Sequence, residues 1–128
     1  MHNQRFIYKV GNTYDCPKDW SWDVAAMQDY DIWLVCAGHG ELDCGGIRHF
    51  LKSGDCFIFK PGASLKASHV PEKPLKVVAA HFEAPETTIG ELLPENGSSF
   101  LYKRLPAPEL TSGALCNAIK NARRNIRD

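Results

Sequence analysis

Short apolar runs separated by glycine turns, between residues 31 and 62, constrain the fold of this chain more than any other feature. The runs cover residues 31–37, 41–44, 47–51 and 56–60 and are rich in residues that favour strands. Gly45-Gly46 between two of them is a two-residue hairpin signal, and Pro61-Gly62 ends the last run. Such close and regular spacing predicts a small antiparallel β-barrel or β-sandwich.

The composition favours one folded domain with a substantial core. The chain has 128 residues, of which 44% are hydrophobic and 23% charged. The formal net charge is zero, so a general basic surface for nucleic acid is not expected. Basic residues gather only near the end, at Lys120, Arg123, Arg124 and Arg127. We interpret them as the solvated face of a helix.

Cysteine usage and hydropathy predict a cytoplasmic location. The five cysteines are odd in number, form no Cys-x-x-Cys pair and lie mostly in apolar runs. Reduced thiols that pack as small hydrophobes explain them better than a disulfide framework does. Neither a signal peptide nor an apolar run of about 18 residues is present, so no membrane partner is expected.

The sequence pattern divides the chain into three predicted segments. Residues 1–18 are predicted as an N-terminal arm with a short strand at 6–10, and residues 19–83 as the barrel, with further strands at 64–69 and 77–82. Residues 84–128 form an extension with an amphipathic helix at about 110–127. Its apolar residues recur at the spacing of one helix face, and Thr111 or Ser112 is the expected N-cap. They are Leu110, Ala114, Leu115, Ala118, Ile119, Ala122 and Ile126, of which Leu115, Ile119, Ala122 and Ile126 are expected to pack on the barrel or on a second copy. The charged helical sequence runs to Asp128, so we expect a truncated chain.

Several short motifs resemble one family. Residues 30–40 end in a Gly-x-Gly turn, residues 51–62 read Leu-x-x-Gly-Asp-x5-Pro-Gly, and Ala80-His81-Phe82 ends a strand. Leu105-Pro106 then precedes the helix. Over residues 19–127 the chain resembles the cupin superfamily, and more specifically the N-terminal ligand-binding and dimerisation domain of AraC-type transcription regulators.

The resemblance implies a fold and a set of partners. The fold would be mainly β, a cupin-like (double-stranded β-helix or jelly-roll) antiparallel barrel with a C-terminal α-helix. A small-molecule effector, such as a sugar or an aromatic acid, would bind inside. The helix would serve in association, so a homodimer is possible. DNA would be bound only through a further domain that is not present in this chain.

The two cupin metal motifs can be placed on the sequence, and their ligands are mostly missing. In the first motif the two histidine positions fall at Ala25 and Met27, and the glutamate position falls at Asp31. In the second, the histidine position falls at Leu65 and the final asparagine position at His69. A catalytic first-row metal needs about three protein donors. The sequence therefore predicts no metal and no other cofactor.

Strand alternation predicts what the barrel interior holds. If Asp31 keeps the inward direction that the resemblance implies for its position, Trp33 on the same face lies inside too; by the same alternation Leu65 shares a face with His69, and Ala79 shares one with His81. An apolar interior with a few polar groups suits a small organic ligand. The predicted ligand-binding residues are Asp31, Trp33, His81, His69, Met27 and Leu65.

Purely structural roles remain open for the same residues. Trp33 can be core, Asp31 can cap a turn or pair with a cation, and His81 can be a core histidine bonded to the backbone. Trp20 and Trp22 can line the barrel mouth or merely cover its base.

Three functions remain after these observations. The preferred one is the effector-binding sensor domain of a regulator, which is not an enzyme. The alternative is a small stand-alone cupin enzyme, an isomerase or oxygenase, that uses a metal or the acid–base pair of His81 and Asp31. The third is a barrel that only mediates self-association.

Overall fold

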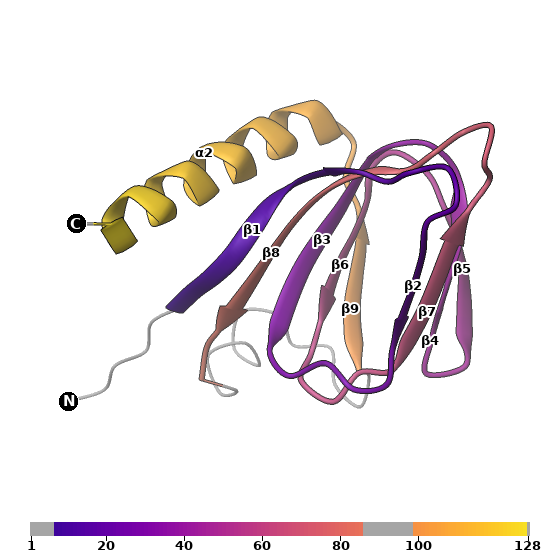
Figure 1. The fold of residues 1–128 in the computed structure, drawn as a ribbon, viewed down its shortest axis with the longest axis horizontal. Coiled ribbons are helices and arrows are strands. Elements are labelled where there is room, and N and C mark those ends of the chain that lie inside the picture. Colours follow the sequence, from indigo (N-terminus) through magenta and orange to yellow (C-terminus); the bar gives the residue numbers. More distant parts are fainter. Residues whose placement is uncertain (1–6, 86–98, 128) are drawn as a thin grey trace.

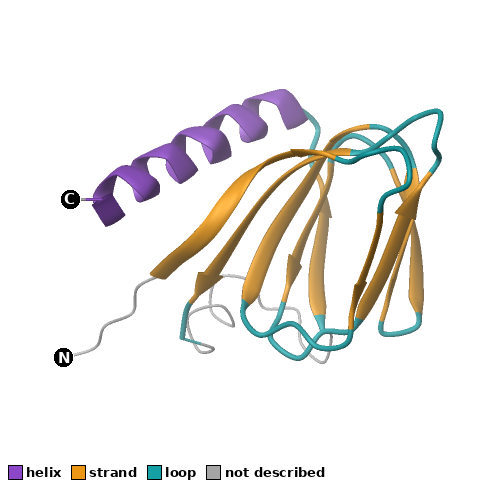
Figure 2. Ribbon diagram, viewed as in Figure 1, coloured by secondary structure: helices purple, strands orange, loops and turns teal. Residues whose placement is uncertain are grey.

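Two antiparallel sheets face each other and a single helix lies outside them. The computed structural model describes residues 7–85 and 99–127. One sheet has the order β1-β8-β3-β6-β9 and the other β2-β7-β4-β5 (Figures 1 and 2). The elements are β1 (Ile7–Asp15), β2 (Ser21–Val24), β3 (Tyr30–Ala37), β4 (Gly40–Cys44), β5 (Ile47–Leu51), β6 (Asp55–Phe59), β7 (Leu65–His69), β8 (Lys76–Glu83), β9 (Phe100–Arg104) and α2 (Pro108–Arg127). The predicted mainly β, jelly-roll-like class is confirmed, although the two sheets do not close into one barrel.

The β4–β5 hairpin forms where the glycine pair predicts it. Cys44 pairs with Ile47, and Gly45 and Gly46 both have positive φ, 60° and 84°. Two successive residues with positive φ make the turn that matches the twist of a hairpin. The backbone N–H of Gly46 also donates to the carboxylate of Asp43 at 3.1 Å, which fixes the turn.

Alternation along β3 and β8 sorts side chains to opposite faces as expected. Asp31 lies opposite His81 across the pair, and Trp33 lies opposite Ala79. Trp33 and Ala79 point into the space between the sheets, where they belong to the main core. Ile32 lies with the group of side chains on the opposite face. The register of these two central strands therefore decides which side chains can reach a site between the sheets.

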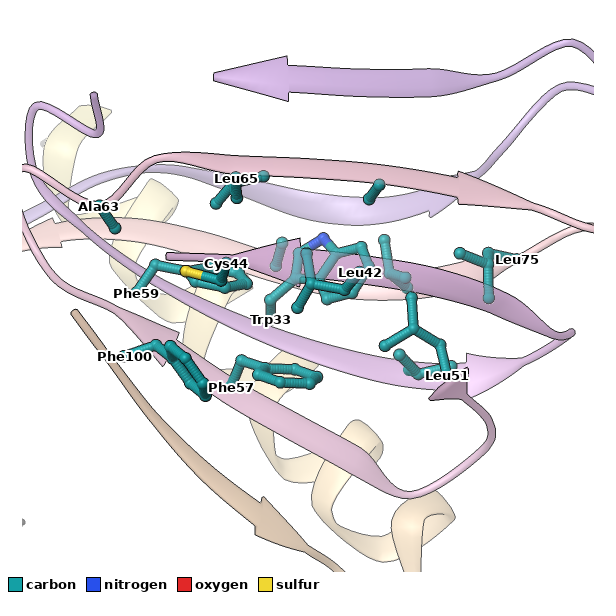
Figure 3. Packing of buried hydrophobic residues seen from close by; sticks show 14 of the residues in the cluster. Trp33, Leu42, Cys44, Leu51, Phe57, Phe59, Ala63, Leu65, Leu75 and Phe100 are labelled. Atoms are coloured by element: carbon teal, nitrogen blue, oxygen red, sulfur yellow. The ribbon is translucent and has the colours of Figure 1, made fainter. Parts of the chain in front are cut away.

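Aromatic and aliphatic side chains fill most of the space between the sheets. Phe57 and Phe59 of β6 stack with ring centroids 5.6 Å apart, and both are fully buried. Figure 3 shows them beside Phe100, with Leu42 and Leu65 of the opposite sheet in the same cluster. Close packing of this kind leaves no room for a ligand among these residues.

The helix α2 covers the outer face of the five-stranded sheet. Ile119 is 5% exposed and packs with Val78 and Ala80 of β8, while Leu115 is partly buried beside them. The helix contacts β1, β3 and β8 (Figure 1). This confirms the predicted apolar face at Leu115 and Ile119, whereas the side chain of Ile126 lies outside the described residues. Leu110, Ala114 and Ala118, which were predicted on the same face, are exposed instead.

The start of the helix differs from the expectation. It begins at Pro108 rather than after a cap at Thr111 or Ser112. Proline is favoured at the first helical position because its fixed φ suits the helix and its missing N–H would lack an intrahelical partner there. Within the described residues, no helix is long and apolar enough to cross a membrane.

Two strands lie outside the segment predicted as the barrel. β1 was expected as an arm with a short strand, yet it runs to Asp15 and pairs with β8 along its length. β9 falls within the predicted extension and pairs with β6. Both are edge strands with many exposed residues, so their sequences lack the alternation of a half-buried strand. β2 was also not identified as a strand, since it has only four residues.

Candidate functional site

A pocket opens between the sheets on the side of β1 and β2. Its volume is about 400 Å³, which is in the range of small-ligand sites. Trp33, Val77 and Ala79 of the five-stranded sheet form one wall, and Trp22 of β2 and Trp20 form part of the other. Residues 13–17, at the end of β1 and the turn that follows, make the rim.

All three tryptophans of the chain border this pocket. Trp22 and Trp33 stack with ring centroids 5.6 Å apart and planes inclined by 30°. Trp33 is only 3% exposed, so it belongs to the core as well as to the pocket wall. Trp20 is half-buried and lies 5.5 Å from the ring of His69. Of the two roles considered for Trp20 and Trp22, the structure supports the one at the mouth.

Asp31 is a buried carboxylate that borders the pocket. It is 1% exposed, and its Oδ1 has no hydrogen-bond partner within the described part of the chain. Oδ2 lies 3.6 Å from Nε2 of His81. Burial raises the pKa of Asp31 to about 7; the charge of His81 opposes that rise and the nearby Asp29 adds to it.

His81 connects the pocket to a second carboxylate. Its Nδ1 lies 2.7 Å from Oδ1 of Asp29, which also forms an ion pair with Lys9 at 3.2 Å. Burial pushes the pKa of Asp29 upward, but hydrogen bonds from His81 and Lys9 outweigh it and hold the pKa below its usual value. Asp29 was not among the predicted site residues. It lies in the bend just before β3, where strand alternation gives no signal, so the sequence pattern did not indicate it.

Three of the six predicted residues meet in this pocket and three do not. Asp31, Trp33 and His81 line it together. Leu65 is buried in the core, and Met27 is buried next to a more open hollow on the Asp29 side of His81. His69 donates from Nε2 to the carbonyl of Lys18 and accepts the N–H of Leu75 at Nδ1, both at 3.0 Å.

Met27 and Leu65 were inferred from metal-ligand positions of the cupin motifs, and His69 from the final asparagine position of the second motif and the strand face that it shares with Leu65. The two ligand positions carry apolar side chains that pack in the core, and His69 uses both ring nitrogens on the backbone. Ala25, at a third ligand position, is exposed. Among residues 7–85 and 99–127, no group of three His, Cys, Asp or Glu side chains is arranged to hold a metal.

The family of the chain follows from comparison with known proteins. The family described as the AraC-like ligand binding domain matches residues 13–126. The match covers most of the chain, so this chain belongs to the family of AraC-like ligand binding domains. No curated protein sequence matches it.

Solved structures show the same fold at low sequence identity. ToxT from Vibrio cholerae O395 bound to (E)-4-(8-methylnaphthalen-1-yl)but-3-enoic acid has a TM-score of 0.64 and 12% identity, over 92% of this chain and 48% of that one. ToxT from strain SCE256 with bound unsaturated fatty acid has a TM-score of 0.60 and 11% identity, over 94% and 48%. YhaK from Escherichia coli has a TM-score of 0.58 and 13% identity, over 79% and 44%. The chain thus spans about half the length of these proteins.

Proposed function

We propose that this chain is the effector-binding domain of an AraC-type transcription regulator and that a small organic effector binds in the pocket between β1 and β2. The observation that carries the proposal is the pocket itself. In a chain of this family, Asp31, Trp33 and His81 converge on a cavity of about 400 Å³ beside an otherwise filled core. A mostly apolar cavity with a few convergent polar groups is the usual form of a small-ligand site.

The remainder of the regulator would lie outside this chain. ToxT is about twice as long as the matched segment. In the proposed regulator the DNA-binding part would occupy such an additional region, and the protein would act in the cytoplasm. The acids named with ToxT support the idea that this fold takes small organic molecules, and sugars and aromatic acids belong in the first screen.

Association through α2 is the second part of the proposal. Leu110, Ala114 and Ala118 are exposed and follow one another at four-residue spacing on the helix. A second copy could cover this stripe. Sedimentation velocity of the wild type and of Leu110→Glu tests it: the wild type should form a dimer that the charged variant weakens. A wild type that stays monomeric at high concentration would contradict the association.

Filling the pocket with a larger side chain, while the core residues stay in place, tests whether the effector binds there. Ala79 lies on the pocket wall, so Ala79→Leu should fill the cavity while Trp33 stays in place. A compound that raises the melting temperature of the wild type should not raise that of Ala79→Leu. Phe50→Ala, on exposed β5, is the control and should respond like the wild type. A compound that stabilises Ala79→Leu equally would place its site elsewhere and remove the support for this proposal.

A further inference from the structure

The pocket contains acceptors and negative charge that a ligand must match. Asp31 and Asp15 are the carboxylates on its lining, and His81 carries its polar nitrogens. Among the described residues that line the pocket there is no lysine or arginine. A carboxylate ligand would therefore enter a site whose fixed charges repel it, without the charge-assisted partner that buried anions require.

The orphaned oxygen of Asp31 shows where a ligand donor is needed. Asp31 is 1% exposed, its Oδ1 has no hydrogen-bond partner among the described residues, and its Oδ2 lies 3.6 Å from Nε2 of His81. An unpartnered buried acceptor costs about 1–3 kcal/mol. A ligand that brings an N–H or O–H to Oδ1 recovers this cost, and one that also brings positive charge offsets the buried charge of the carboxylate.

The indole rings provide the remaining contact surface. Trp20, Trp22 and Trp33 surround the same cavity, and Val77 and Ala79 complete an apolar wall. Aromatic faces attract cations, most strongly when water is excluded, and also hold an apolar body. Aromatic rings beside a buried carboxylate therefore favour a cation with an organic tail over a neutral molecule of the same shape.

We infer that the pocket takes a protonated organic amine, whose ammonium group is held at Oδ1 of Asp31 and whose apolar body lies against the tryptophans. This inference rests on the proposed function and names the chemical class of the effector. It assigns Asp31 the role of selecting ligands by charge, and His81 the role of orienting Asp31 from β8.

Probes that share one apolar body and differ in the charge of their head group test the inference. One set shares the phenylethyl body: 2-phenylethylamine, 2-phenylethanol and 3-phenylpropanoate. A second set shares a linear body: hexylamine, hexanol and heptanoate, and arabinose is the polyol. Binding is followed by tryptophan fluorescence, since all three tryptophans border the site. At pH 8 an amine should bind about tenfold or more tighter than its matched alcohol, and the carboxylate should bind weakest.

Asp31→Asn separates charge from shape. The amide keeps the size of the side chain but removes its charge, so amine and alcohol should then bind within about threefold of each other. Ala79→Leu should abolish binding of every probe, and Phe50→Ala should leave all affinities at their wild-type values.

The pH dependence of amine binding provides an independent test of the role of Asp31. The groups around Asp31 are His81 on β8, Asp29 and Lys9 behind His81, and Asp15 on β1. Amine affinity should increase as pH rises from 6 to 8, because Asp31 loses its proton while an alkylamine stays charged. In Asp31→Asn this increase should be lost. If it persists, a group other than Asp31 causes the dependence and the role of Asp31 is overturned.

The remaining outcomes distinguish this inference from the proposed function. If arabinose or a carboxylate binds more tightly than the amines, and Ala79→Leu blocks that binding, the charge selection is wrong and the effector pocket stands. Equal affinity of amine and alcohol in the wild type would also overturn the charge selection. If no probe of any charge binds, both proposals lose their support.

Discussion

The two edges where the sheets meet are built in opposite ways. At the edge between β5 and β9, His49 lies against the rings of Phe57, Phe100 and Tyr102 with centroids 5.2 to 5.3 Å apart, and side chains fill the space. At the edge between β1 and β2, the sheets part around a pocket of about 400 Å³. The same two-layer fold thus fills one edge with side chains and leaves the other open.

The turn between β1 and β2 explains the open edge. Residues 16–20 run from one sheet to the other, and only Cys16 among them is fully buried. The backbone N–H of Cys16 is bonded to the carbonyl of Leu75 at 3.0 Å, which ties the turn to the start of β8. At the other edge, aromatic side chains from β5, β6 and β9 meet directly. At the open edge Trp22 and Trp33 still stack across the two sheets, and the space beside them, toward the turn, stays unfilled.

The largest expected difference is in the cost of truncating an aromatic ring at each edge. Phe57→Ala removes a fully buried ring from the filled edge and should lower the free energy of unfolding by about 3–5 kcal/mol. Trp20→Ala removes a half-buried ring from the open edge and should cost about 1 kcal/mol. Urea denaturation of both variants measures the difference. Equal losses would mean that the two edges are equally packed.

The second prediction concerns the charge buried at the open edge. The pKa of Asp31 is about 7 in the folded chain, above its ordinary value of 3.8. Between these values the folded chain holds more protons than the unfolded chain, so its stability falls as pH rises from 4 to 8. One pKa unit corresponds to about 1.36 kcal/mol. Between pH 4 and pH 8 the free energy of unfolding of Asp31→Asn should therefore rise by roughly 3–4 kcal/mol relative to that of the wild type.

The measurement is the difference in unfolding free energy between wild type and Asp31→Asn at pH 4 and at pH 8. Taking the difference between the two proteins cancels the titration of the shared groups that do not interact with Asp31, so the difference reports Asp31 together with its coupling to His81 and Asp29. At pH 4 the two should be nearly equal, because a protonated carboxyl and an amide are similar in size and polarity. A gap that stays constant with pH would show that Asp31 is not the group responsible.

Behind the open edge, α2 supports the sheet that carries the pocket wall. Ile119 is 5% exposed under the helix, whereas Leu110 on the same helix is 75% exposed. At a protein concentration low enough to keep the chain monomeric, Ile119→Ala should therefore lower the free energy of unfolding by about 2 kcal/mol, and Leu110→Ala by less than about 0.5 kcal/mol. Urea denaturation compares them. Similar small losses for both would mean that α2 does not stabilise the sheet.

Period-two alternation and glycine turns made the central strands predictable from sequence. Asp31, Trp33 and His81 were assigned to one interior because their strands alternate, and the hairpin was assigned from Gly45-Gly46. These signals are local, so tertiary packing does not change them. β9 carries no such signal, because only Phe100 and Leu101 are apolar before three exposed residues.

The rest of the site depends on contacts between distant segments. Trp20 and Trp22 reach the pocket only because β2 pairs with β7 and faces β3 across the core. Leu65 and Met27 were placed in the site by analogy with metal-ligand positions, but apolar side chains at such positions pack as core. Only the relative position of the two sheets decides which inward side chain borders a cavity and which is covered.

The smallest expected effect comes from two histidines, one at each edge. His69 uses both ring nitrogens, donating to the carbonyl of Lys18 and accepting from the N–H of Leu75. His49 lies among aromatic rings, and its buried Nε2 has no hydrogen-bond partner within the described residues. His69→Phe leaves two backbone groups without their partner and should cost about 1–2 kcal/mol. His49→Phe removes an unpaired polar atom and should be neutral or stabilise by up to about 1 kcal/mol.

Thermal unfolding of the two variants side by side provides the comparison, because both exchange the same side chains. The sign of the difference matters more than its size: His69→Phe should melt below the wild type, and His49→Phe at or above it. If His49→Phe melts lower than His69→Phe, the Nε2 of His49 has a partner that stabilises the fold. The filled edge would then depend on a polar contact, and the contrast between a packed edge and an open edge would no longer hold.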